Sequence, residues 1–185
     1  MSETFKNVGE MLDYFAKEEN IQERFVEKLI AAYPQLFPKD TDGKPREPDC
    51  GAWCPVGWQP MVEELCSKLA KIVEEKNLTF EIGQIKEKFG GLRFYYSYKG
   101  DRVDEISDLI HGAEERSFKI CEVTGEDGEL RIKGKGYGWL KTLSDGEAGR
   151  QGYETLKEEG YSVEQLRDIG RIAATINALS KVLSA

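Results

Sequence analysis

The sequence predicts an α+β fold, with a small antiparallel sheet centred on a hairpin over residues 78–98 and covered by several helices. The first observation is alternation of apolar and polar residues on both sides of Gly90-Gly91, which is typical of two half-buried strands joined by a two-residue turn. The second is that apolar residues return every three or four positions on either side of this segment, as in amphipathic helices. The alternating residues are Leu78, Phe80 and Ile82, and then Leu92, Phe94 and Tyr96.

Length and composition favour one globular domain over residues 1–185. Hydrophobic residues make up 39% of the chain, which is enough for a sizeable core. The net charge of −8 argues against a dedicated polyanion-binding protein, because such proteins carry a surplus of basic residues. It leaves room for a local basic patch. The chain has no apolar run long enough for a membrane span and no secretory signal at its start, so we expect a cytoplasmic protein without membrane partners.

The N-terminal part, residues 1–37, predicts two helices. Asn20 is expected to cap the second one, with Glu23 at the capping-box position, and Tyr33-Pro34 is expected to end it. Residues 38–60 contain five of the six prolines and predict a loop.

Residues 61–150 are expected to form the α+β core. Helix 61–76 carries a buried stripe, and helix 101–119 follows the hairpin. Residues 121–150 are glycine-dense and predict short strands and turns, and residues 161–185 predict a C-terminal helix. The stripe of the first of these helices consists of Val62, Leu65, Cys66, Leu69, Ile72 and Val73.

The hairpin carries the sharpest chemical feature of the sequence. With Gly90-Gly91 as the turn, Lys88 lies opposite Arg93, and a bulge at Gly83 restores the apolar alternation. One face then carries apolar side chains, and the other carries Lys86, Lys88, Arg93 and Tyr95. Like charges opposite each other destabilise a strand pair, so this face is predicted to bind an anion or a partner. The alternative is neutralisation by acids of the neighbouring helix, namely Asp104, Asp108 or Glu115.

The stretch from Gly57 to Ala148 resembles a widespread family of uncharacterised bacterial and prophage proteins. The most specific matching piece runs from Lys86 to Tyr95, Lys-Glu-Lys-Phe-Gly-Gly-Leu-Arg-Phe-Tyr. The other matching pieces are Gly57-Trp58, Leu65-Cys66, Ala113-Glu114 with Ser117, Cys121-Glu122-Val123-Thr124-Gly125, and Gly138-Trp139-Leu140-Lys141-Thr142-Leu143. The resemblance implies a phage or prophage origin and leaves the activity open.

In this family the last region resembles a zinc knuckle, Cys-x-x-Cys-Gly followed by Leu-Cys-x-x-His. Residues 121–148 form the corresponding region here, and Cys121 keeps the first ligand position. Thr124, Ser144 and Glu147 stand at the other three positions. One thiolate and one carboxylate do not make a structural zinc site, so no metal is expected at Cys121. Packing by Trp139 and Leu143 is expected to hold this region instead.

For the other candidate sites, an ordinary structural role is the alternative explanation. Cys50, Cys54 and Cys66, with His111 as a fourth ligand, would make a Cys3His zinc site, but Cys66 also belongs to the buried helix stripe. His111 itself is expected to be a surface or half-buried residue.

The remaining candidates are weaker. The helical acids Asp108, Glu114 and Glu115 are a possible metal or acid–base cluster, although such runs are mostly solvated faces. Gly134, Gly136 and Gly138 resemble a phosphate-binding loop without its usual lysine spacing.

Three functions remain, from different classes. The first is a non-enzymatic phage or prophage-encoded protein that binds a host protein in the host cytoplasm, for example a counter-defence inhibitor such as an anti-CRISPR. The second is a nucleotide or nucleic-acid binding module that uses the basic hairpin face. The third is a metal-dependent enzyme that uses the helical carboxylates. The single histidine, His111, lowers the expectation of an enzyme, because a Ser–His or Cys–His pair would have to use it and most zinc hydrolases need two or three histidines. No cofactor is expected.

Overall fold

The computed structural model describes residues 7–134 and 139–156, and the protein has an α+β fold. A two-stranded hairpin packs against helices, and a second, smaller antiparallel sheet follows it. The predicted C-terminal helix 161–185 lies outside the described residues. The described elements are α1 (Val8–Ala32), η1 (Pro34–Leu36), η2 (Val56–Trp58), α2 (Gln59–Glu75), β1 (Thr79–Lys88), β2 (Gly91–Lys99), α3 (Asp104–Ser117), β3 (Glu129–Lys133), β4 (Trp139–Leu143), α4 (Asp145–Gln151) and β5 (Glu154–Thr155).

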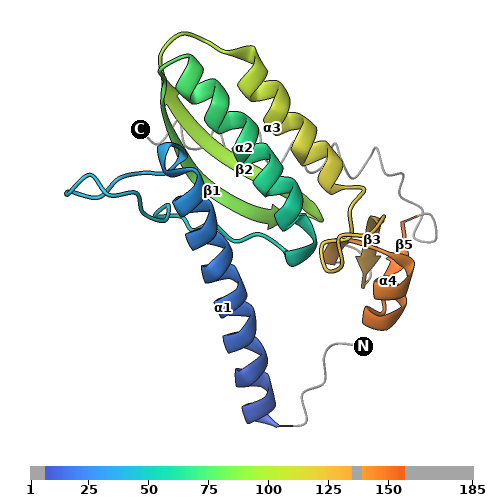
Figure 1. Cartoon of the computed structure of the whole chain (residues 1–185). Coiled ribbons are helices and arrows are strands. Elements are labelled where there is room, and N and C mark those ends of the chain that lie inside the picture. Colours follow the sequence, from blue (N-terminus) through green and yellow to red (C-terminus); the bar gives the residue numbers. More distant parts are fainter. Residues whose placement is uncertain (1–6, 135–138, 157–185) are drawn as a thin grey trace, which may run out of the picture.

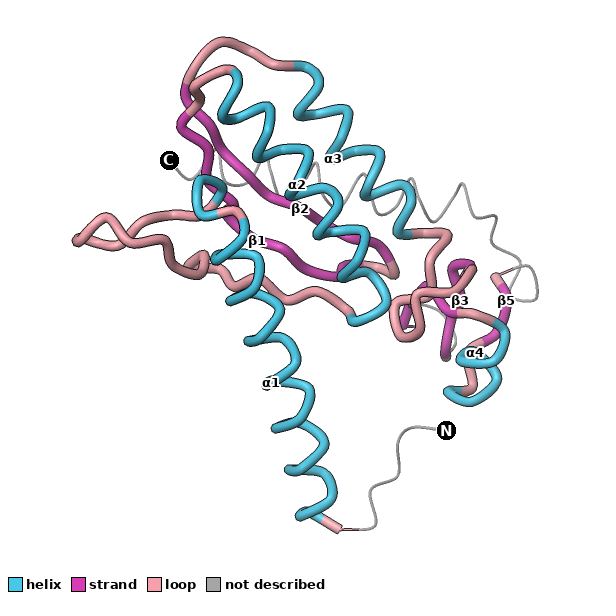
Figure 2. The backbone as a smooth tube through the Cα atoms, in the orientation of Figure 1, coloured by secondary structure: helices cyan, strands magenta, loops and turns pink. Residues whose placement is uncertain are grey.

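The N-terminal part forms one helix, α1, so the prediction of two helices is wrong. Asn7 caps α1 by accepting a hydrogen bond from the Glu10 N–H, whereas Asn20 lies exposed in the middle of the helix. A single asparagine costs only about 0.7 kcal/mol in a helix interior, which is too little to break it without a glycine or proline nearby. The predicted end is confirmed, because Tyr33 terminates α1 directly before Pro34. The first half of α1 stands away from the rest of the described chain (Figure 2).

Helix α2 confirms the predicted stripe, since all of its six residues are buried. Pro60 lies in the first turn, where a missing N–H costs nothing. Helices α2 and α3 lie side by side over one face of the β1–β2 hairpin (Figure 1). Helix α3 begins at Asp104, three residues later than the sequence predicts, after Val103 in extended conformation.

The hairpin is confirmed, but its turn lies one residue earlier than predicted, so the predicted cross-strand partners are wrong by two residues. The two-residue turn consists of Phe89 and Gly90, which both have positive φ angles of 56° and 72°. Consequently Lys88 pairs with Gly91, and Lys86, not Lys88, lies opposite Arg93. The bulge at Gly83 is confirmed, because the register shifts between Ile82 and Gln84. Both Ile82 and Ile85 are thereby buried against the helices.

One large apolar core joins the second half of α1, the stripe of α2, the covered face of the hairpin and the inner side of α3. Trp58 at its end is fully buried, and its indole N–H donates to the Ile120 carbonyl at 2.8 Å. The part of the chain that the structure describes has no helix of the length and apolar composition that would span a membrane.

The second sheet has the strand order β4-β3-β5 and lies at the tip of the hairpin. The Thr142 hydroxyl donates to the Gly90 carbonyl at 2.6 Å and joins β4 to the turn. Helix α4, which the sequence did not predict, ends at Gly152 in left-handed conformation. Leu143 is fully buried as predicted, but Trp139 is 80% exposed, so its predicted packing role is wrong.

Candidate functional site

The basic hairpin face consists of Lys86, Lys88, Arg93 and Tyr95, and the structure brings all four side chains to one side of the β1–β2 hairpin. Moving the turn by one residue shifts each cross-strand partner by two positions, which keeps each residue on its side because side chains alternate with a period of two. Helices α2 and α3 cover the opposite side, so the basic hairpin face lies away from them.

Aromatic rings hold all three cations of this face. The Lys86 ammonium lies 5.2 Å from the centroid of the Tyr95 ring, and the Lys88 ammonium lies 5.3 Å from that of Phe89. The Arg93 guanidinium lies 6.0 Å from the Phe118 ring. Such contacts stabilise a charge by about 0.5–1 kcal/mol at exposed sites without neutralising it. The rings therefore fix the positions of the three positive charges without neutralising them.

No ion pair among the described residues joins these three cations to a carboxylate. Of the acids expected to neutralise them, Asp104 pairs with Arg102 at 2.6 Å, and Asp108 lines a groove between α2 and α3. Arg93 donates to the Leu92 carbonyl at 2.7 Å.

The carboxylate of Glu114 interacts electrostatically with Arg93, but its hydrogen bond is to the backbone at the edge of β2. It accepts a hydrogen bond from the Phe94 N–H at 3.0 Å, and the Ser117 hydroxyl accepts one from the Leu92 N–H at 2.9 Å. Burial raises the pKa of Glu114, while the Phe94 N–H and the Arg93 charge oppose the rise. Glu114 and Ser117 are thus tied to the hairpin backbone.

Trp53 is a further residue of this side that the sequence did not reveal. The backbone N–H of Trp53 donates to the Ile85 carbonyl at 2.9 Å, and Ala52 forms a parallel bridge with Ile85. Because Ala52 is buried with Ile85 and neighbours alternate, Trp53 points to the side of Lys86. Its side chain is 47% exposed. The extended stretch is only a few residues long within the proline-rich loop, which is too short for a periodic signal.

The predicted Cys3His set is not brought together. Cys50 is exposed, whereas Cys54 and Cys66 are buried, and His111 is exposed on α3. Burial raises the pKa of Cys66 to about 12 and also raises that of Cys54, so both thiols stay protonated. Cys66 packs as a small apolar residue. Within residues 7–134 and 139–156, no three His, Cys, Asp or Glu side chains are grouped as metal ligands would be.

Cys121 lies in a nest of hydrogen-bond donors. Burial raises its pKa, but the Thr124 hydroxyl and the N–H groups of Ser144, Thr124 and Val123 outweigh that effect and lower it. Three of the four zinc-knuckle positions therefore lie together. Glu147, at the fourth, pairs with Arg150 at 2.6 Å. The absence of zinc at Cys121 stays a prediction.

A second cluster of charges lies where the hairpin tip meets the small sheet. Glu122 is 5% exposed and pairs with the Lys141 ammonium at 2.8 Å, while its other carboxylate oxygen has no hydrogen-bond partner among the described residues. The Glu87 carboxylate accepts from the Gly90 N–H at 2.6 Å. Burial raises the pKa of both carboxylates, and Lys141 opposes the rise. The cluster joins residues from distant elements, so no local sequence pattern predicts it.

Replacing Lys141 by methionine is expected to lower the free energy of unfolding at pH 7 by about 1–2 kcal/mol. The value lies below that for a fully buried pair because Lys141 is partly exposed. The raised pKa values of Glu87 and Glu122 mean that the folded state binds protons more tightly than the unfolded one. Their stabilising contribution is complete below the unfolded value of about 4.3 and is lost as the pH rises through the folded values.

The cost of Lys141→Met should therefore shrink as the pH falls from 7 to 5. Urea unfolding at pH 5, 6 and 7 measures it, and Lys71→Met on the exposed side of α2 serves as the control. An equal cost at all three pH values would contradict the assignment of Lys141 as the cation of this cluster.

Scans of protein-family models, curated proteins and solved structures each gave no match to this chain. The resemblance to the bacterial and prophage family therefore stays a prediction carried by its motif residues.

Proposed function

We propose that this protein is a non-enzymatic binding protein that uses the basic hairpin face to bind an acidic surface of a protein partner. The observation that carries the proposal is the set of three cations, each held by an aromatic ring and none paired with a carboxylate among the described residues. The phage or prophage setting, with a host protein as the partner and counter-defence such as anti-CRISPR inhibition as the role, comes from the family resemblance and belongs to the same proposal.

Electrostatics supplies the reason for an external anion. Lys86 and Arg93 lie directly opposite each other on the two strands, and like charges in that arrangement destabilise a hairpin. A carboxylate of a partner would offset this repulsion when it binds between them. Arginine together with aromatic side chains also dominates the energetics of protein interfaces. Tyr95 and Phe89, which are 39% and 42% exposed, provide such rings at this face.

The net charge of −8 favours a protein partner over a polyanion. The remaining surface would repel a long nucleic acid, whereas a protein with a local acidic patch meets only the basic hairpin face. A nucleotide or nucleic acid is the second candidate, because aromatic rings beside cations also stack with bases. The two candidates differ in which probe binds more tightly.

The double variant Lys86→Glu with Arg93→Glu tests the proposal. A fluorescein-labelled peptide of glutamate and tyrosine residues serves as the acidic protein probe, and a labelled single-stranded oligonucleotide serves as the nucleic-acid probe. We expect the peptide to bind the original protein in a salt-dependent way and the double variant at least tenfold more weakly, or about 1.4 kcal/mol. Fluorescence anisotropy at two salt concentrations measures both.

The matched control is Lys71→Glu with Lys76→Glu, which makes the same change in net charge on exposed positions of the α2 end. It should bind the peptide nearly as well as the original protein. Unchanged peptide binding in the hairpin variant would overturn the proposal. Tighter binding of the oligonucleotide than of the peptide, lost in the same variant, would assign the face to nucleic acid instead.

A further inference from the structure

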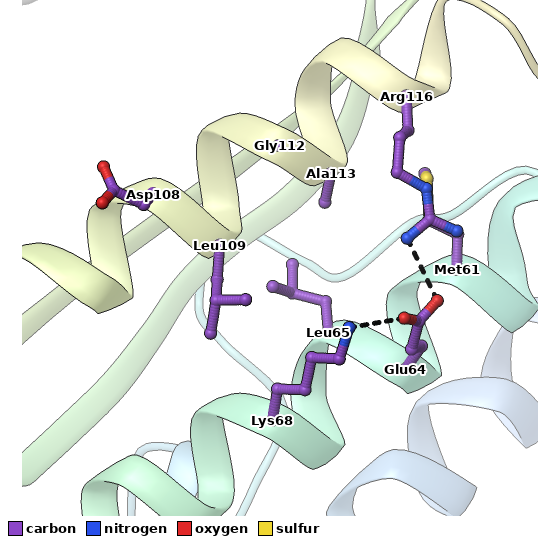
Figure 3. A pocket seen from close by; sticks show the side chains of 9 residues that line it. All are labelled: Met61, Glu64, Leu65, Lys68, Asp108, Leu109, Gly112, Ala113 and Arg116. Atoms are coloured by element: carbon purple, nitrogen blue, oxygen red, sulfur yellow. Dashed lines mark hydrogen bonds and ion pairs between the residues drawn. The ribbon is translucent and has the colours of Figure 1, made fainter.

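A groove of about 140 Å³ lies between α2 and α3 and is lined only by residues of these two helices (Figure 3). Leu65 of α2 and Leu109 and Ala113 of α3 provide its apolar wall. Drug-sized ligands occupy pockets of about 300–1,000 Å³, so this groove has room for a single side chain and not for a cofactor. Its place on the helical layer separates it from the basic hairpin face on the other side of the hairpin.

One end of the groove carries an excess positive charge. The Glu64 carboxylate pairs with Lys68 of its own helix at 2.6 Å and with Arg116 of α3 at 3.1 Å (Figure 3). Hydrogen bonds from Lys68 first, and then from Arg116, hold the pKa of Glu64 below its ordinary value, so the carboxylate stays ionised. Two cations share this single negative charge, which leaves one positive charge at the rim. All three side chains are about half exposed and open to a ligand.

Gly112 keeps the groove open on the α3 side. A Cβ atom at this position would meet no atom within 4 Å, whereas the neighbouring Ala113 is buried. A longer side chain at position 112 would therefore extend into the free space of the groove, which Gly112 lines, without disturbing the helix packing. The α3 backbone can be approached here because a glycine occupies this position.

We propose that the groove between α2 and α3 binds one leucine- or phenylalanine-sized side chain from a peptide segment of a partner protein, with a carboxylate of that segment bound by Arg116 and Lys68. The volume and apolar wall select the side chain, and the excess positive charge at the rim selects the acid. Asp108, which also lines the groove, disfavours a second carboxylate and gives the segment a direction. The groove and the basic hairpin face share no residue, so each can bind its ligand independently of the other.

N-acetyl-L-phenylalaninate carries both elements of the proposed ligand and is the probe. It is titrated into the full ¹⁵N-labelled chain, and amide chemical shifts are recorded. We expect saturable shifts confined to residues around Leu65, Leu109 and Gly112. N-acetyl-L-phenylalaninamide, which lacks the carboxylate, should bind at least fivefold more weakly, and N-acetylglycinate, which lacks the ring, should give no saturable shift.

The variant Gly112→Leu fills the groove and should weaken phenylalaninate binding at least tenfold. Its matched control is Gly146→Leu on α4, where a Cβ also meets no atom within 4 Å and binding should be unchanged. Arg116→Gln provides a second test that does not depend on Gly112, since it should abolish the preference for the acid over the amide.

Three outcomes would overturn the proposal. The first is the absence of saturable shifts at 20 mM probe, and the second is binding that survives Gly112→Leu in a folded variant. The third is self-association of the chain that Gly112→Leu abolishes, because the groove would then belong to a second copy. Loss of peptide binding at the basic hairpin face affects none of these measurements, so the two proposals fail separately.

Discussion

Replacement of both Gly90 and Gly91 by valine is expected to lower the free energy of unfolding by more than about 4 kcal/mol, which is a large part of the stability of an ordinary domain. Gly90 has a φ of +72°, and a Cβ there would lie 2.3 Å from Leu130 Cδ1 and 3.2 Å from the Lys141 backbone. A Cβ at Gly91 would lie 2.3 Å from the Phe118 ring. Positive φ alone costs about 1–2 kcal/mol in a residue with a side chain.

Urea unfolding followed by circular dichroism measures this effect. The matched control is Gly146→Val with Gly149→Val on α4, where added Cβ atoms meet nothing within 4 Å and the unfolding midpoint should hardly change. A Gly90→Val, Gly91→Val variant within about 1 kcal/mol of the original protein would show that the hairpin tip does not dock on the second sheet and α3 as described.

Gly57→Ala is expected to cost about 3 kcal/mol or more, although it adds only one methyl group. The added Cβ would lie 2.1 Å from the Cys121 carbonyl oxygen and 2.6 Å from the Gly125 nitrogen, and both atoms belong to the backbone. The Gly57 N–H also donates to the Glu122 carbonyl at 2.9 Å. Because backbone cannot rotate away as a side chain does, the segment 121–125 must separate from the core.

Hydrogen exchange and urea unfolding together test this expectation. Amides of residues 121–133 and 139–156 should lose protection more than those of α2, because their attachment beside Trp58 is what the methyl group disrupts. Gly112→Ala adds the same methyl group into open space and is the control. Unchanged protection over 121–125 in Gly57→Ala would refute the close approach of these two segments.

The sequence predicts the hairpin, its bulge and helix α2 because each depends on a local pattern. It fails at the register, since two glycines in a row suggest a turn of their own. The structure uses them for close approach instead: Gly90 sits against β4 and Gly91 against Phe118, and Phe89 takes the other turn position. This use of glycine depends on segments far along the chain, which no local rule includes.

The candidate site also combines residues that a local pattern predicts with residues that depend on distant segments. Its four residues were predictable because alternation assigns a face, and an error of two positions in the cross-strand partners leaves that face unchanged. Trp53 reaches that side only through a bridge between a loop and β1, and the cluster of Glu122 with Lys141 depends on how two sheets meet. The exposed Trp139 shows the converse, because apolar character alone does not decide burial in so small a sheet.

The edges of the hairpin near its tip have a consequence for how a partner can bind. On the β1 side, residues 51–53 exchange hydrogen bonds with Ile85, and on the β2 side the N–H groups of Leu92 and Phe94 are bonded to Ser117 and Glu114. A peptide strand that tried to extend this sheet would have to displace a loop or a helix first. Strand addition, by which exposed sheet edges recruit other chains or aggregate, is thereby blocked at both edges near the tip. Recognition at this end of the hairpin must proceed through side chains on its face.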